Sequence, residues 1–215
     1  PDVSTRPWPP GSNARQHGPA LSPEQVLRVM DDAGVDRAIL VPPSWPGDDN
    51  TDSLEGARRW PDRFAVMGRF DPRAADASER LDRWRHQHGM LGIRLTFHLP
   101  RWAAWLTDGT LDWFWAAAER LALPLMIHVP GQAPAVGAIA RRHPKLRLII
   151  DHLARWSGSK DDAAWADLDQ VLALGISPNV AVKVSALPCY TSEPYPYAGL
   201  DRHLRARGAP AVGAL

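Results

Sequence analysis

The chain has little cysteine and no long apolar run. Cys189 is the only cysteine among 215 residues, which excludes an internal disulfide framework and favours a reducing compartment, so we predict a cytoplasmic protein. The sequence shows no signal-peptide pattern and no apolar segment long enough to span a bilayer, and we therefore expect no membrane association. Cys189 as a nucleophile is a weak alternative, because no base is evident beside it.

A dominant charge of one sign is also missing. The chain carries 25 Lys and Arg against 24 Asp and Glu, for a formal net charge of +1. The two signs are interspersed along the sequence, which argues against a surface dedicated to nucleic acid. The 21 prolines often follow a predicted strand or helix, so they mark the ends of many short elements rather than a low-complexity segment.

Two apolar segments that each end in histidine form the most informative pattern. Residues 124–128 and 146–152 are predicted strands that end at His128 and His152, with a predicted helix over 135–143 between them. In a βα barrel the carboxyl ends of neighbouring strands meet at one mouth, where active sites are built. Two imidazoles there could bind a metal, polarise a carbonyl or transfer a proton. The alternative for each is a histidine that caps its loop.

Two basic residues lie inside other apolar segments. Arg94 belongs to the predicted strand 91–97, and Lys183 belongs to the apolar run 180–184. A charge in such a run is costly to bury unless it is paired or functional. For Lys183 the alternative is an outward-facing strand residue whose amino group reaches solvent, since side chains alternate between the two faces of a strand.

Strands and helices alternate along the whole chain. The predicted strands cover residues 37–41, 64–70, 91–97, 124–128, 146–152 and 180–186, and the predicted helices cover 22–34, 52–60, 75–88, 111–122, 135–143, 161–174 and 197–207. Such alternation implies parallel strands joined by right-handed crossovers. We predict an α/β fold of the (β/α)8 TIM-barrel type, incomplete, with about six βα units in a single domain over 1–215. Because a full barrel takes about 250 residues, we expect one unit before Pro1 and one to two after Arg207 to be missing.

Four segments occur in an order and at a spacing that a known family shares. They are Ala33–Val41, Gly92–Leu95, Ile150–Leu153 and Asn179–Ser185. With them the chain resembles the amidohydrolase superfamily, in its amidohydrolase-related branch. That branch includes lactonases that open 2-pyrone-4,6-dicarboxylate or sugar lactones, and decarboxylases of the aminocarboxymuconate-semialdehyde type. The resemblance implies a distorted (β/α)8 barrel with a carbonyl- or carboxylate-bearing substrate at its carboxyl-terminal mouth.

The resemblance also implies roles for particular residues. His152 matches the sixth-strand histidine, which polarises the carbonyl or assists proton transfer. His128 matches the fifth-strand position, which is a ligand in metal-using members and is therefore the candidate metal ligand. Arg94 matches an arginine that binds a substrate carboxylate, where a planar fork suits two oxygens. Lys183, Ser185 and Tyr190 match positions of the seventh strand and its following loop that lie near the substrate.

The chain departs from the family pattern at two places. The His-any-His motif of the first strand is absent, and so is the aspartate of the eighth strand that binds metal or activates water. A zinc site needs three or four ligands, and the sequence offers His128 and at most one further candidate. We therefore expect weak or no zinc binding by this chain, with no cofactor, or a divalent metal such as zinc, in the complete protein.

Three hypotheses about function follow. The leading one is a hydrolase in which water attacks a lactone or similar carbonyl of a carboxylated small molecule, with catalytic His152 and His128 and with Arg94 holding the carboxylate. The second is a zinc-dependent decarboxylase, in which His128 would be a ligand and His152 an acid or base. The third is a truncated barrel fragment without catalysis, and we expect inactivity for these 215 residues alone. The partner expected is a small-molecule substrate, with a homo-oligomer left open.

Overall fold

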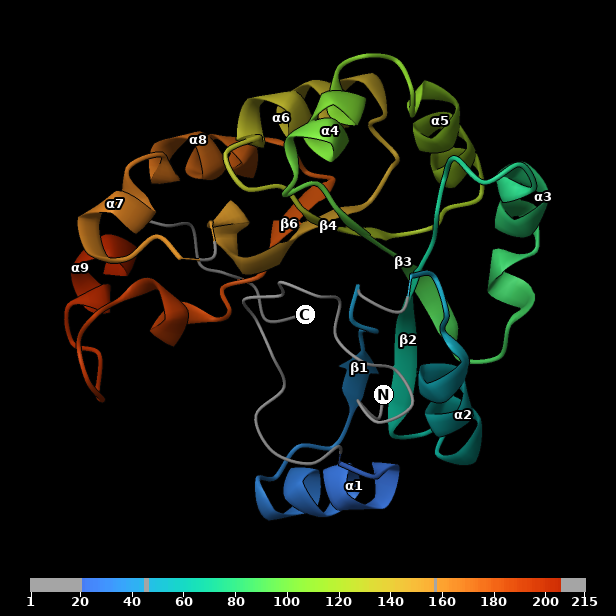
Figure 1. Ribbon diagram of the computed structural model, residues 1–215, viewed down its shortest axis with the longest axis horizontal. Helices are drawn as coiled ribbons and strands as arrows, with labels where there is room; N and C mark the ends of the chain where they lie inside the picture. Colours follow the sequence, from blue (N-terminus) through green and yellow to red (C-terminus); the bar gives the residue numbers. More distant parts are fainter. Residues whose placement is uncertain (1–20, 45–46, 157, 206–215) are drawn as a thin grey trace. The chain divides into compact units, whose positions relative to one another are not determined.

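The computed structural model describes residues 21–44, 47–156 and 158–205. The chain divides into two compact units, Pro1–Arg94 and Leu95–Leu215, and each is described by itself. In both units strands alternate with helices along the chain (Figure 1).

Among the described residues of the first unit, three strands follow one another in chain order. Its elements are α1 (Pro23–Asp32), β1 (Ala38–Leu40), α2 (Thr51–Arg59), β2 (Phe64–Arg69), α3 (Ala77–Asp82), the 3-10 helix η1 (Trp84–His86) and β3 (Met90–Thr96), whose last two residues belong to the second unit. The strands pair in parallel, β1 with β2 and β2 with β3. At the start of α1, Ser22 and Gln25 stand three residues apart and form a capping box, which satisfies two orphan backbone donors.

The second unit repeats the pattern with three more parallel strands. Its α-helices and strands are α4 (Pro100–Ala103), α5 (Asp112–Arg120), β4 (Leu125–His128), α6 (Ala133–Arg142), β5 (Leu148–Ile150), α7 (Asp161–Trp165), α8 (Leu168–Leu172), β6 (Val180–Val182) and α9 (Leu200–Arg205). Four 3-10 helices join them: η2 (Ala104–Leu106), η3 (Asp151–Ala154), η4 (Ala173–Ile176) and η5 (Leu187–Tyr190). Strand β5 pairs in parallel with β4 and with β6.

Burial explains why these segments form strands. Leu125, Met126 and Ile127 of β4 are all buried, and in β5 Leu148 and Ile150 are. Near-continuous apolar runs of this kind are typical of parallel strands that are covered on both faces. The six strands, their parallel pairing and their alternation with helices confirm the α/β fold of an incomplete TIM barrel. The single domain over 1–215 stays a prediction.

Two predicted helices are shorter than the sequence pattern indicates. The helix expected over 75–88 ends at Asp82, because Trp84 turns inward and its indole N–H donates to the Gly92 carbonyl of β3. The helix expected over 161–174 breaks after Trp165, where the Ala164 carbonyl accepts from the guanidinium of Arg155. A carbonyl bound in this way is less able to accept the next helical hydrogen bond. The last helix begins at Leu200, and residues 206–207 lie outside the described part of the chain.

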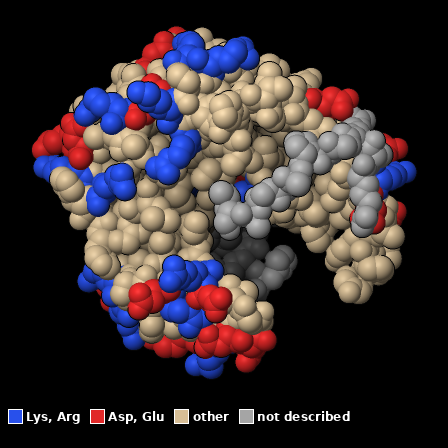
Figure 2. Space-filling view, turned by 180° about the vertical axis from the view of Figure 1, so that it is seen from behind, with Lys and Arg blue, Asp and Glu red and all other residues tan. Residues whose placement is uncertain are grey.

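Acidic and basic side chains lie interspersed over the face that Figure 2 displays. The sequence shows the same mixture. Of the helices in the described ranges, none is long and apolar enough to cross a membrane.

Candidate functional site

The first candidate residue stands where the sequence predicts it. His128 is the last residue of β4 and is half-buried. Its carbonyl accepts a hydrogen bond from the backbone N–H of Phe97, at 2.8 Å. The backbone around His128 is therefore held by regular pairing, which places its imidazole at the carboxyl end of the strand.

A third histidine joins the two predicted ones. The ring centroid of His128 lies 5.7 Å from that of His152, edge to face, and 6.2 Å from that of His98. His98 also makes an edge-to-face contact with Trp102. We call His98, His128 and His152 the histidine cluster. Sequence reasoning missed His98, although it follows the predicted strand 91–97 directly, so the pattern that identified the other two could have found it.

The second candidate residue lies on a different backbone from the one predicted. Strand β5 ends at Ile150, whereas the sequence predicts a strand that continues to His152. His152, Leu153 and Ala154 all have left-handed backbones, with φ values of 52°, 53° and 54°. In this conformation Cβ crowds the following carbonyl, at a cost of about 1 kcal/mol or more for each residue. Residues 151–155, which we call the His152 turn, must therefore be held by contacts with their surroundings.

Lys183 supplies three of those contacts. Its backbone N–H donates to the Ile150 carbonyl at 2.8 Å, and its carbonyl accepts from the backbone N–H of Leu153 at 3.1 Å. Its Nζ lies 2.8 Å from Oδ1 of Asp151, whose side chain is only 2% exposed. The contacts of Lys183 thus fall on both sides of the point where the backbone becomes left-handed.

The segment after β6 also fixes the ring of His152. Nδ1 of His152 lies 2.8 Å from Oγ of Ser185, within hydrogen-bond distance. A hydroxyl can donate or accept, so this contact is available to either tautomer of the ring. It orients the imidazole, and Nε2 is the ring nitrogen that Ser185 does not engage.

A buried arginine completes the His152 turn. Arg155 is 1% exposed, and its Nε donates to the Leu153 carbonyl at 2.8 Å. Its Nη1 donates to the Ala164 carbonyl at 2.6 Å and forms an ion pair with Asp167. One guanidinium therefore ties the left-handed turn to the region between α7 and α8.

The remaining predicted residues are also placed. Tyr190 is buried in η5 with its ring edge-to-face against Trp165, and burial raises the pKa of its phenol, which stays neutral at physiological pH. Arg94 is buried on β3, 7% exposed, and belongs to the first unit. The substrate-binding roles of Arg94, Lys183, Ser185 and Tyr190, and the catalytic roles of the two histidines, stay predictions.

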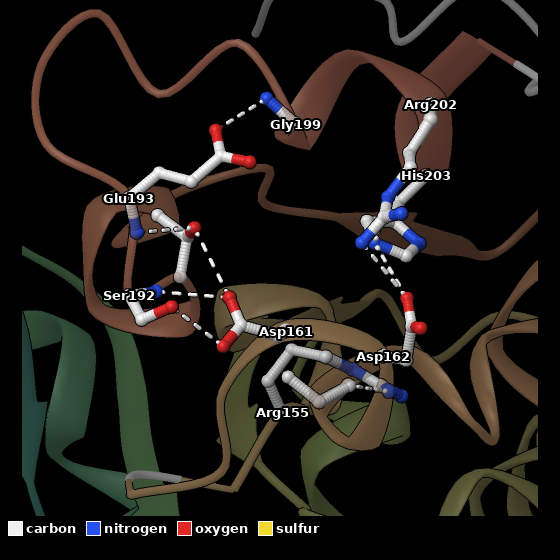
Figure 3. Close-up of polar contacts among 10 residues, drawn as sticks. Arg155, Asp161, Asp162, Ser192, Glu193, Gly199, Arg202 and His203 are labelled. Carbon is white, nitrogen blue, oxygen red and sulfur yellow. Dashed lines mark hydrogen bonds and ion pairs between the residues drawn. The ribbon is translucent and has the colours of Figure 1, made fainter.

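A second polar network lies around the start of α7 (Figure 3). Oδ1 of Asp161 accepts from the Ser192 backbone N–H at 2.9 Å, and Oδ2 accepts from the Ser192 hydroxyl at 2.8 Å. The Ser192 backbone N–H, followed by its hydroxyl, holds the pKa of the Asp161 carboxyl below its ordinary value. Asp162 pairs with Arg202 at 3.0 Å and with His203 at 3.5 Å. These residues form what we call the α7 carboxylate cluster.

The donor set of the histidine cluster was tested against the needs of a metal ion. Zinc in proteins takes three or four ligands with convergent geometry. Within residues 21–44, 47–156 and 158–205, no group of three or more His, Cys, Asp or Glu side chains is placed to hold a metal. His152 in addition has Nδ1 directed at Ser185. The described residues therefore do not fit a zinc site by themselves.

What the cluster can do chemically follows from its groups. Neutral imidazoles accept protons and imidazolium ions donate them near neutral pH. An oriented ring N–H can also stabilise negative charge that develops on a carbonyl oxygen. The arrangement suits chemistry at a carbonyl group, with the His152 ring oriented by Ser185 and the His128 backbone paired at the end of β4.

Comparisons with known proteins agree with the observed fold. L-fucono-1,5-lactonase of Burkholderia ambifaria is 29% identical over 170 residues, which is 78% of this chain and 58% of that relative. The chain thus spans less than two thirds of the relative's length. A zinc-bound amidohydrolase of Burkholderia multivorans is 25% identical, with a TM-score of 0.65, covering 77% of this chain and 59% of that one.

The fold alone is shared with a more distant structure. A probable 2-pyrone-4,6-dicarboxylic acid hydrolase of Acinetobacter baumannii, with citric acid bound, has a TM-score of 0.70 at 18% identity and covers 94% of this chain and 73% of that one. The model of the amidohydrolase family matches residues 3–209. Since this match takes in nearly the whole sequence, the chain belongs to the amidohydrolase family.

Proposed function

We propose that the protein hydrolyses a lactone or a similar carbonyl of a carboxylated small molecule. The observation that carries the proposal is the placement of His152, whose ring is oriented by Ser185 and lies beside His128 at the carboxyl end of β4. The lactonase among its relatives supports the choice of a cyclic ester as substrate. Because the chain spans less than two thirds of that relative's length, the activity of the whole protein is a proposal.

His152 has the central role in this reaction. Water adds to the carbonyl carbon and the carbonyl oxygen becomes negative, so an imidazole N–H directed at that oxygen stabilises the transition state more than the ground state. The ring centroid of His128 lies 5.7 Å from that of His152, and His128 serves as a second acid or base beside it. The base that activates the water is not assigned to a described residue.

Substrate binding is proposed for Arg94, Ser185 and Tyr190. Arg94 would hold the carboxylate through paired charge-assisted hydrogen bonds. Its guanidinium is buried within the first unit, where a charge is retained only if it is paired or has a binding role. Lysine cannot reproduce the two parallel donors of that fork.

The test compares two lactone substrates, one carboxylated and one neutral. Arg94→Lys should lower kcat/KM for the carboxylated lactone about 10- to 100-fold, as expected for a lost charged hydrogen bond of about 1.5–3 kcal/mol, and should barely affect the neutral one. His152→Asn should lower kcat on both, by on the order of 100-fold, because it acts at the reacting carbonyl. Steady-state kinetics of the purified protein measure both effects.

Matched controls come from the surface. Arg142→Lys and His86→Asn change exposed residues of the same types and should leave both substrates unaffected. Equal loss on both substrates in Arg94→Lys, together with full turnover in His152→Asn, would contradict the assigned roles. Release of carbon dioxide without ring opening would favour the alternative activity, a decarboxylase of the same superfamily.

A further inference from the structure

We infer that Asp151 and Lys183 are positioning residues, which together hold the His152 turn in its left-handed conformation and so place the His152 imidazole at the site. The inference rests on the proposed function for the meaning of that placement. We call the contacts of Asp151 and Lys183 with the His152 turn the clamp, and all of them lie within the second unit.

The turn needs an external support. Three consecutive residues other than glycine have positive φ values, and the same chain with an ordinary backbone would direct the His152 side chain elsewhere. Left-handed residues other than glycine occur mainly where surrounding structure imposes them, and they gather at functional sites. The support must therefore come from groups outside residues 152–154.

Lys183 meets the turn on both sides of its change in handedness. Its N–H continues the parallel ladder to Ile150, the last residue of β5, and its carbonyl receives the N–H of Leu153 inside the left-handed stretch. Because Lys183 binds both Ile150 and Leu153, it fixes the distance between these two residues. The backbone from Ile150 to Leu153, which includes His152, has to turn within that distance.

The ion pair adds a contact that depends on side-chain chemistry. Asp151 is 2% exposed, so its carboxylate has given up most of its water and requires a compensating charge. Nζ of Lys183, whose side chain is 32% exposed, supplies that charge at 2.8 Å. This pairing links the residue before His152 to the same Lys183 whose backbone spans the turn.

Lys183 and Ser185, only two positions apart in the sequence, both contact the region of His152. Lys183 binds the backbone on either side of His152, and Ser185 contacts its ring. Nζ of Lys183 is already engaged by the buried Asp151 carboxylate at 2.8 Å, so a move toward substrate would weaken that ion pair. The contacts therefore favour an action of Lys183 through His152 over direct contact with substrate.

Amide hydrogen exchange of the full chain, measured by NMR, tests the clamp without any substrate. The reporters are the Leu153 amide, which donates to the Lys183 carbonyl, and the Lys183 amide, which donates to Ile150 in the ladder. Asp151→Asn and Lys183→Met should each speed exchange at Leu153 by about tenfold, and leave the Lys183-position amide within about twofold. The double variant should exchange at Leu153 no faster than either single variant, because both substitutions remove the same ion pair.

A rescue and a control accompany these variants. Lys183→Arg keeps a cation opposite Asp151 and should retain slow exchange at Leu153. Glu119→Gln removes another carboxylate contact in the second unit, the one 3.2 Å from His143, and should leave Leu153 unchanged. Unchanged Leu153 exchange in both single variants would overturn the clamp. So would equal acceleration at Leu153 and at position 183, which would report a general loss of stability.

Turnover separates this inference from the proposed function. In a protein that opens lactones, Asp151→Asn should lower kcat with KM nearly unchanged, because a displaced His152 affects the transition state and leaves the substrate contacts in place. A fall in substrate affinity with kcat unchanged would overturn the positioning role. If the unaltered complete protein opens no lactone, the proposed function fails, and hydrogen exchange alone decides whether Asp151 and Lys183 hold the turn.

Discussion

Two polar networks of the second unit use similar groups and differ in burial. In the His152 turn, the Asp151 side chain is 2% exposed and that of Arg155 is 1% exposed. In the α7 carboxylate cluster, the Asp162 side chain is 82% exposed and that of its partner Arg202 is 60% exposed. A buried charge that loses its partner cannot be solvated by water, whereas an exposed charge can. Burial, more than the number of contacts, therefore sets how much each network should contribute to the free energy of unfolding.

The two networks also differ in what they hold. The buried one supports three consecutive left-handed residues and a histidine of the candidate site. The exposed one joins α7 to the segment that follows η5, through Asp161 and Ser192 (Figure 3). We expect disruption of the first to affect both stability and chemistry, and disruption of the second to affect mainly acid stability.

The largest effect is expected from the buried guanidinium. Arg155→Met leaves the Leu153 and Ala164 carbonyls and the Asp167 carboxylate without their donor, so the free energy of unfolding should fall by about 3 kcal/mol. Urea unfolding followed by circular dichroism measures the change. Arg142→Met removes a half-exposed arginine that pairs with Asp112 and should cost less than about 0.5 kcal/mol. Equal losses of unfolding free energy in the two variants would contradict the expectation that burial sets the contribution of each arginine.

An intermediate effect is expected at Asp161, in acid. Its folded-state pKa lies below the ordinary value, chiefly because the Ser192 backbone N–H binds the carboxylate. The stability that it contributes is present above the unfolded-state pKa, near 4, and is lost as pH falls through the lower folded-state value. Asp161→Asn should therefore lower Tm at pH 7 and flatten its decline as the pH falls below about 4. A decline as steep as that of the unaltered protein would contradict this.

The smallest effect is expected at Asp162. Its pairs with Arg202 and His203 are at the surface, where solvent and salt screen them. Asp162→Asn should change the free energy of unfolding by less than about 0.5 kcal/mol, measured by urea unfolding at neutral pH. A loss comparable to that of Arg155→Met would show that the exposed network carries more than its burial suggests.

Local patterns in the sequence account for much of the fold. The capping box at Ser22 and Gln25 follows from spacing alone, and it is present. The apolar run before His128 predicts a strand that ends at that residue, as β4 does. Such features depend on residues that are neighbours along the chain, so local propensity and period suffice to predict them.

Contacts across the chain account for what the sequence could not predict. Nothing near residue 164 indicates that Arg155 binds its carbonyl, so the predicted helix over 161–174 has no visible reason to break. The apolar run that ends at His152 likewise predicts a longer strand than β5. Each outcome depends on a side chain or backbone group brought from another element, and local pattern carries no record of such a partner.

The candidate site shows the same division. The sequence by itself determined the strand-and-helix alternation and the strand that ends at His128, because periodicity and residue type specify both. Only the tertiary structure decided that His152 stands on a left-handed turn, with Lys183 bound on both sides and Ser185 against its ring. The physical reason is that a strained backbone persists only where distant residues hold it, and those residues lie about 30 positions further along the chain.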